Sequence, residues 1–315
     1  MKLQKRATLP GVRERNLHKN IYWRQRYLLL LLVPSMIFFI IFHYVPLYGV
    51  TIAFKDYQIK QGILGSPWVG LEHFRRLFAM ESFWQVFKNT IVISAWKFIF
   101  GFPAPIIFAV LLNEIQHNVI KKPIQTISYL PHFISWVVLG GILTQLLSPS
   151  TGPVNIIIKA FGGEPIYFLA DPKWFRTVLV VSHVWKGIGW GSIVYLAALS
   201  GMNQEVHEAA IVDGATRIQR IIKITIPEIT PIITIMLILG VGGLIKDDFD
   251  QVFNLYNSAV YSVGDVLSTY TYRAGLVNME YSFATAVELF KNIISVTLVL
   301  TTNAICRRLD DNAIW

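Results

Sequence analysis

The stretch that decides the fold reads Glu208-Ala209-Ala210-Ile211-Val212-Asp213-Gly214-Ala215-Thr216-Arg217-Ile218-Gln219-Arg220-Ile221-Ile222-Lys223-Ile224-Thr225-Ile226-Pro227. It is the longest clearly amphipathic segment between strongly apolar ones. Asn203, just ahead of it, can cap a short helix, and Glu205 is favourable in the first turn of that helix. The pair Asp213-Gly214 is expected to end the helix, because glycine readily takes the left-handed conformation at a helix end.

A second short helix is predicted after the glycine. Thr216 and Gln219 have the spacing of a capping box, in which the two side chains satisfy amides of the first turn. Pro227 is expected to break this helix before the next apolar segment. The segment 203–227 is therefore predicted to form two helices joined by a turn and lying across a membrane surface.

The composition indicates a membrane protein. Of the 315 residues, 54% are hydrophobic and only 15% are charged, whereas soluble proteins carry about 25% charged residues. The formal net charge is +9, but the basic residues flank apolar runs instead of forming one patch, so we expect no nucleic-acid partner. Cys306 is the only cysteine, which excludes an intramolecular disulfide and a thiol-based metal site.

Six apolar windows approach the roughly 20 residues that a membrane-spanning helix needs. The first follows a basic tail without a signal-peptide cleavage site, so it is predicted to be retained. The sequence thus predicts an all-α, polytopic membrane protein with about six transmembrane helices. The windows are 27–44, 90–112, 127–147, 177–199, 231–245 with a few more residues, and 284–306.

Lysine and arginine counts predict the orientation. The tail 1–26 carries eight of these residues, and the short segments on the same side of the membrane carry more. Both termini are therefore expected in the cytoplasm, with a cytoplasmic tail at 1–26, a transmembrane domain at 27–306 and a cytoplasmic tail at 307–315. The longer connections on the outer side offer a surface for an extracytoplasmic partner.

The amphipathic stretch resembles a known motif. Its order is Glu-Ala-Ala, three residues, Gly, nine residues and Ile-x-Ile-Pro. This resembles the coupling motif of ABC-importer permeases, whose usual ending is Ile-x-Leu-Pro, so Ile226 is the one departure. Residues 44–56 are similar to the end of the first span in maltose-permease-like carbohydrate permeases. The stretches 68–74, 100–105 and 250–256 look similar to the branch that handles oligosaccharides released from polysaccharides.

This resemblance implies a type I ABC-importer permease in the bacterial cytoplasmic membrane. It implies a second homologous permease, two ATPase subunits that bind ATP and magnesium, and an extracytoplasmic binding protein that delivers an oligosaccharide. This chain has no phosphate-binding Gly-x-x-x-x-Gly-Lys-Ser/Thr loop, so we expect neither catalysis nor a cofactor in it. The residues expected to couple it to the ATPases are Glu208, Ala209, Ala210, Asp213, Gly214, Ala215 and Pro227.

Polar and aromatic residues inside or beside the apolar windows are candidates for the substrate path, because buried ionisable groups in a membrane usually face a cavity or a partner. Tryptophans are also common as interfacial anchors, and Glu288 and Lys291, three residues apart on a helix, can form a purely structural pair. Lysines such as Lys97 and Lys186 raise the hypothesis of an acidic sugar, such as a uronate oligomer. The candidates are Trp185, Lys186, Trp190, Tyr195, Gly243, Asp247, Glu288 and Lys291.

Two other classes of membrane protein remain alternatives. A self-sufficient secondary carrier or channel for a small polar solute would need a buried ion site and often shows internal repeats, and neither is evident in the sequence. An intramembrane enzyme would need convergent catalytic groups, but the seven histidines are dispersed and no His-Glu-x-x-His motif occurs. The prediction is therefore a transport subunit without a catalytic or metal site.

Overall fold

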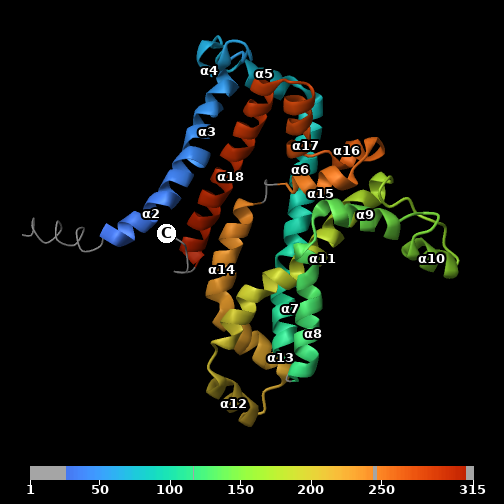
Figure 1. Ribbon diagram of the computed structural model, residues 1–315. Coiled ribbons are helices and arrows are strands. Elements are labelled where there is room, and N and C mark those ends of the chain that lie inside the picture. Colours follow the sequence, from blue (N-terminus) through green and yellow to red (C-terminus); the bar gives the residue numbers. More distant parts are fainter. Residues whose placement is uncertain (1–25, 116, 244–246, 310–315) are drawn as a thin grey trace, which may run out of the picture.

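A computed structural model describes residues 26–115, 117–243 and 247–309 of the chain (Figure 1). Within these ranges the regular elements are helices, and the only β contact is an isolated bridge between Lys55 and Trp68. This confirms the predicted all-α class. Most of the expected tail 1–26 and residues 310–315 of the expected tail 307–315 lie outside the described residues.

The helices are numbered as in Figure 1, with η marking 3₁₀ and π turns. Several follow one another without a break, so that one long helix carries two to four labels. The elements are α2 (Arg26–Phe39), η1 (Ile40–Tyr44), α3 (Val45–Leu47), η2 (Tyr48–Phe54), α4 (Gly62–Gly65), α5 (Glu72–Ala79), α6 (Glu81–Gly101), α7 (Pro103–Asn113), α8 (Asn118–Tyr129), η3 (Leu130–Phe133), α9 (Trp136–Leu146), α10 (Pro153–Ala160), α11 (Pro172–Ser200), α12 (Gln204–Val212), α13 (Arg217–Arg220), η4 (Ile221–Thr225), α14 (Ile226–Gly242), α15 (Phe249–Leu255), η5 (Ser258–Val260), α16 (Tyr261–Gly264), α17 (Leu267–Tyr272), η6 (Arg273–Val277) and α18 (Tyr281–Leu309).

Four continuous helical runs in the described part of the chain are long and apolar enough to cross a membrane: Arg26–Phe54, Glu81–Asn113, Arg217–Gly242 and Tyr281–Ile305. Helix α11 has 29 residues and is about 43 Å long at 1.5 Å per residue. It is also long enough to cross, although it is less apolar than the other four.

The third predicted window, 127–147, is not one straight helix. The segments Asn118–Phe133 and Trp136–Leu146 pass the length and composition test only as a pair, and they are bent by 106°. Pro131 lies in the short 3₁₀ turn η3, and Ile134 and Ser135 then take extended backbone conformations. The Ser135 hydroxyl accepts a hydrogen bond from the amide of Val138 and so caps a new helix, α9.

Packing around α11 organises the fold. This helix contacts α6, α7, α8 and α14, and α14 in turn packs on α18. The approach to α8 is very close, since a Cβ atom at Gly189 would overlap the carbonyl group of Ser128. Only glycine fits there, as in other membrane helix interfaces built on small residues. The run beginning with α2 instead contacts α18 mainly through η2, and its apolar window has no buried residue.

Candidate functional site

The segment between α11 and α14 has the predicted helix–turn–helix form. The side chain of Asn203 caps α12 by accepting a hydrogen bond from the amide of Glu205 at 2.9 Å. Gly214 has a φ of +79°, the left-handed conformation expected at the end of this helix. The capping box is present as well, with the amide of Thr216 bonded to Gln219 Oε1 at 2.8 Å and the amide of Gln219 bonded to Thr216 Oγ1 at 3.3 Å. These local predictions are confirmed.

The prediction that Pro227 breaks the second helix is wrong. The chain runs as one helix from Arg217 to Gly242, and Pro227 lies in the first turn of α14. A proline inside a regular α-helix clashes with the carbonyl four residues earlier, here that of Lys223. The structure has a wider π turn at Ile221–Thr225, which ends two residues before the proline. This turn accommodates the ring and keeps α13 and α14 mechanically continuous.

The helix–turn–helix projects from the end of the fold opposite α4 and α5 (Figure 1). Helix α12 has no buried residue, and Val212 is 87% exposed and Ile218 is 69% exposed. Apolar side chains gathered on a projecting segment are typical of a surface that docks on another protein. The carboxylate of Glu208 is exposed on the same helix, whereas Ala210 is only half-buried. The segment thus offers small and apolar groups beside exposed acidic side chains, those of Glu205, Glu208 and Asp213.

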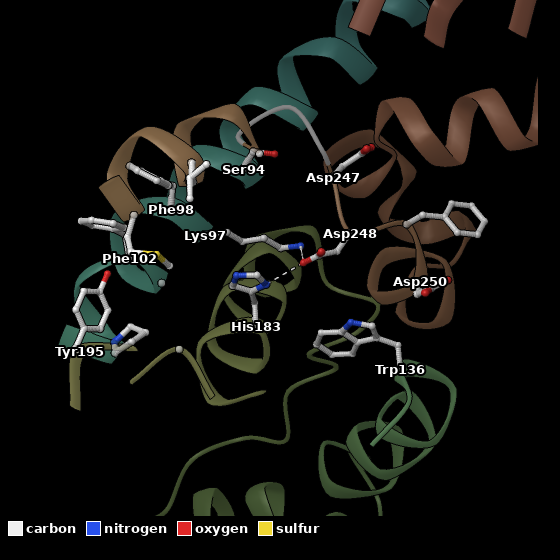
Figure 2. Close-up of a pocket in the computed structure, with 18 residues that line it drawn as sticks. Ser94, Lys97, Phe98, Phe102, Trp136, His183, Tyr195, Asp247, Asp248 and Asp250 are labelled. Carbon is white, nitrogen blue, oxygen red and sulfur yellow. Dashed lines mark hydrogen bonds and ion pairs between the residues drawn. The ribbon is translucent and has the colours of Figure 1, made fainter. Parts of the chain in front are cut away.

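A cavity of about 830 Å³ is lined by apolar, aromatic and ionisable side chains and is shown in Figure 2. We refer to it as the polar cavity because of its ionisable groups. Helices α6, α7, α9, α11, α14 and α15 contribute to its wall, and the connection between α14 and α15 contributes two aspartates. Its lining residues are Ser94, Lys97, Phe98, Gly101, Phe102, Pro105, Trp136, His183, Gly191, Tyr195, Met236, Leu239, Gly240, Gly243, Asp247, Asp248, Phe249 and Asp250. Aromatic faces and carboxylates on one wall are suited to a ligand with hydroxyl groups and apolar C–H surfaces.

Asp248 connects two helices in this wall. Figure 2 shows Lys97 and His183 pointing toward the aspartate, and Asp248 Oδ2 lies 3.1 Å from Lys97 Nζ and 2.8 Å from His183 Nδ1. Burial by itself raises the pKa of the Asp248 carboxyl, but the hydrogen bond from His183 and the charge of Lys97 together hold that pKa well below its usual range. Asp248 therefore ties the residues just before α15 to α6 and α11.

The neighbouring Asp247 ties the same connection to α17 and α18. Asp247 Oδ2 accepts a hydrogen bond from the amide of Ser268 at 2.7 Å, and Oδ1 lies 3.6 Å from Lys291 Nζ. Lys291 also pairs with Glu288 at 2.9 Å, so the predicted pairing of these two residues is confirmed. The two aspartates together hold the residues just before α15 at the wall of the cavity.

Comparison with known proteins decides the family. Residues 101–249 match the family model described as the binding-protein-dependent transport system inner membrane component. Protein LplB of Bacillus subtilis is 41% identical over 302 residues, covering 94% of this chain and 95% of LplB. The chain belongs to the ABC-importer permeases.

Further relatives support this assignment. The polygalacturonan/rhamnogalacturonan transport system permease YteP of Bacillus subtilis is 41% identical to the permease over 292 residues, which are 93% of this chain and 91% of YteP. A crystal structure of a bacterial ABC transporter that imports the acidic polysaccharide alginate superimposes with a TM-score of 0.86 at 41% identity, covering 93% and 99% of the two chains. The permease therefore has the predicted type I importer fold.

The structure distributes the predicted substrate-path residues over several places in the permease. Tyr195, Gly243 and Asp247 line the polar cavity. Glu288 and Lys291 line a second cavity of about 530 Å³ beside α17 and α18.

The other three candidates lie outside both cavities. Trp185 lines a separate apolar groove between α6 and α11. Lys186 donates hydrogen bonds to the backbone carbonyls of His132 and Ile134, and the ring of Trp190 stacks on His132 with centroids 4.6 Å apart. Lys186 and Trp190 thus support the bend between α8 and α9.

The cavity also brings together Lys97, His183 and Asp248, which are not among the eight substrate-path candidates, although Lys97 contributes to the hypothesis of an acidic sugar. Each is an ionisable residue inside or beside an apolar window, and this was the available signal, because such residues in membrane proteins usually face a cavity or a partner. Their mutual pairing was not accessible from spacing, because Lys97 and Asp248 are 151 residues apart.

Proposed function

We propose that this permease carries an oligosaccharide across the bacterial cytoplasmic membrane, as one of two permease subunits driven by two ATPase subunits and supplied by an extracytoplasmic binding protein. Two comparisons support the cargo: YteP is named for polygalacturonan and rhamnogalacturonan transport, and a related importer, at a TM-score of 0.85 and 40% identity, has been solved with a periplasmic protein that binds an alginate pentasaccharide. ATP and magnesium belong to the ATPase subunits, and this chain is a transport subunit.

The observation that carries the proposal is the connection between the projecting segment and the cavity. Helix α11 contributes His183, Gly191 and Tyr195 to the cavity wall and ends at Ser200, just before α12. Helix α14 contributes Met236 and Gly240 and is continuous with α13. A displacement of α12 and α13 by an ATPase would therefore move two walls of the cavity.

The projecting segment 203–227 is accordingly the proposed coupling element. The proposed contact with the ATPase is formed by exposed Glu208 and Ala209, by half-buried Ala210 and by the turn at Asp213, Gly214 and Ala215. Pro227 lies in the first turn of α14, where a displacement of α13 would be transmitted to α14.

The proposed topology has six spans with both termini in the cytoplasm. It is supported by the four apolar runs, the bent pair and α11, and by the basic residues of the tail 1–26.

The two lysines that line the cavities described above are both paired with carboxylates. Lys97 pairs with Asp248, Lys291 pairs with Glu288 and Asp247, and Lys186 is bonded to backbone carbonyls. Asp250 adds a further carboxylate to the wall of the polar cavity. This wall of the cavity therefore suits sugar hydroxyls, which donate hydrogen bonds to carboxylates.

The test is reconstitution of both permeases and both ATPases in lipid nanodiscs with the cognate binding protein. We expect a uronate or neutral oligosaccharide to make the binding protein stimulate ATP hydrolysis. Stimulation by a solute of another class, with none by any oligosaccharide, would overturn the cargo.

Two tryptophan variants locate the sugar within the chain. Trp136 lines the polar cavity, so Trp136→Ala should raise the substrate concentration that gives half-maximal transport about fivefold. This factor corresponds to the roughly 1 kcal/mol of an aromatic contact. Trp185→Ala is the matched control, because this ring lines a different groove. Equal effects of the two substitutions would contradict the placement of the path.

A further inference from the structure

A second concave surface lies between α6, the start of α7 and α11, and nothing in the transport mechanism uses it. It has a volume of about 780 Å³ and is lined almost entirely by apolar side chains, among them Val92, Trp96, Phe100, Val181 and Trp185. We refer to it as the α6–α11 groove.

The α6–α11 groove faces away from the polar cavity. Successive residues of an α-helix are 100° apart, so residues separated by two positions point to nearly opposite sides. On α6, Trp96 lines the groove and Phe98 lines the cavity; on α11, Val181 and Trp185 line the groove and His183 lines the cavity. If the cavity belongs to the transport path, the groove is on the face that meets lipid.

Two cationic side chains stand at one end of the groove. Lys173 and Arg176 lie in the first two turns of α11, and Lys173 is exposed. Arg176 donates hydrogen bonds to the carbonyl of Val263 at 3.0 Å and to Oδ1 of Asn89 at 2.8 Å, and both acceptors are neutral. Within residues 26–309 as far as they are described, neither cation forms an ion pair with a carboxylate. The groove thus combines an uncompensated positive end with an apolar body.

The dimensions fit one leaflet of a bilayer. From Lys173 to Ile188, the last α11 residue of the lining, the helix rises about 22 Å at 1.5 Å per residue. The hydrocarbon part of one leaflet is about 15 Å thick, half of the full core, and the headgroup lies beyond it. The cationic end is the end of α11 remote from α12, so the groove lies in the leaflet away from the coupling segment.

We propose that the α6–α11 groove binds one anionic glycerophospholipid, with its phosphate at Lys173 and Arg176 and its acyl chains along Trp96, Phe100, Val181 and Trp185. A lysine or arginine near an anionic headgroup attracts it strongly enough to tighten lipid binding about fivefold. The apolar body holds the acyl chains whatever the headgroup, so the two cations supply the preference for an anionic lipid.

The experiment is a lipid titration of the intact purified transporter, followed by native mass spectrometry. The probes are phosphatidylglycerol and phosphatidylcholine with identical acyl chains. We expect tighter retention of phosphatidylglycerol, and Lys173→Gln should weaken that retention about fivefold while leaving phosphatidylcholine unchanged. Lys159→Gln, which changes an exposed lysine of α10 outside the groove, is the matched control and should have no effect.

A second pair of variants tests the apolar body. Val181→Trp should obstruct the groove and reduce retention of both lipids, whereas Ile107→Trp, at an exposed position outside the lining, should not. The proposal is overturned if phosphatidylglycerol and phosphatidylcholine bind equally in the wild type, if Lys173→Gln and Lys159→Gln behave alike, or if Val181→Trp leaves retention unchanged. Loss of all lipid retention in the wild type would indicate that the companion permease covers the groove, and would also overturn the proposal.

Discussion

The asymmetric burial of the Lys97–Asp248 pair predicts which partner is more costly to remove. The Lys97 side chain is only 8% exposed, whereas that of Asp248 is 38% exposed, and Asp248 also keeps a hydrogen bond to His183. Asp248→Ala leaves a buried ammonium group without its carboxylate. Lys97→Met leaves a carboxylate that is partly hydrated and still bonded. Asp248→Ala should therefore destabilise the permease more than Lys97→Met.

The magnitudes follow from this difference in environment. Removing one partner of a buried ion pair costs about 3–5 kcal/mol, and the partial exposure of Asp248 to the cavity puts Asp248→Ala near 3 kcal/mol. Lys97→Met should cost about 1 kcal/mol, the scale of a partly exposed pair. The double variant Lys97→Met/Asp248→Ala leaves no unpaired charge and should be more stable than Asp248→Ala alone, so the two substitutions are coupled.

The assay is thermal unfolding of the purified transporter, with intrinsic fluorescence as the signal and all variants in the same detergent and lipid. We expect the midpoint to be highest for the wild type and lowest for Asp248→Ala, with Lys97→Met and the double variant between them. Asp248→Asn should lie between Lys97→Met and Asp248→Ala, because the amide oxygen can still accept both hydrogen bonds. An equal loss in Lys97→Met and Asp248→Ala, or a double variant with the sum of the two losses, would refute the reasoning.

Three further outcomes are expected from the helix termini and close approaches. Gly214→Pro should abolish uptake and substrate-stimulated ATP hydrolysis while membrane insertion is retained. Proline fixes φ near −65° whereas Gly214 has a φ of +79°, and proline lacks the amide hydrogen that Gly214 donates to the carbonyl of Ile211. Gly214→Ala should cost only about 1 kcal/mol of stability, and full activity of the proline variant would count against coupling through this turn. Glu208→Lys should reduce stimulated ATP hydrolysis. It should not lower the unfolding midpoint, because the Glu208 side chain is exposed. A lowered midpoint with normal stimulation of ATP hydrolysis would contradict this role of Glu208. Gly189→Leu should prevent assembly of a stable permease, as judged by gel filtration. Gly187→Leu should be tolerated, because a Cβ atom at Gly187 would have no neighbour within 4 Å. A stable Gly189→Leu permease together with an unstable Gly187→Leu permease would be inconsistent with the α8–α11 contact.

Local features of the fold were predictable because their causes are local. The caps of α12 and α13 depend on Asn203, Gly214, Thr216 and Gln219, which act within a few residues of their own positions. The spacing around the same residues also carried the resemblance to importer permeases. The pairing of Glu288 with Lys291 was predictable for the same reason, since a helix brings residues three apart together.

Features that depend on competing local effects or on tertiary contacts were not predictable. Pro227 is a helix breaker by propensity, but the adjacent π turn keeps the helix continuous. The bend at Pro131 divides a window that hydropathy alone treats as one span. Asp248 meets His183, which is 65 residues away, only after α11 and the α14–α15 connection have packed. The residues of the polar cavity therefore required the structure.

The central prediction is ATP-driven uptake of an oligosaccharide through a complex that contains this chain. The measurement is accumulation of a labelled oligosaccharide in proteoliposomes loaded with ATP and supplied with the binding protein, comparing the full complex, the complex with Gly214→Pro and this chain alone. We predict accumulation by the full complex and none by the other two. Accumulation by this chain alone, without ATPase subunits, would contradict the account and would identify a self-sufficient carrier or channel.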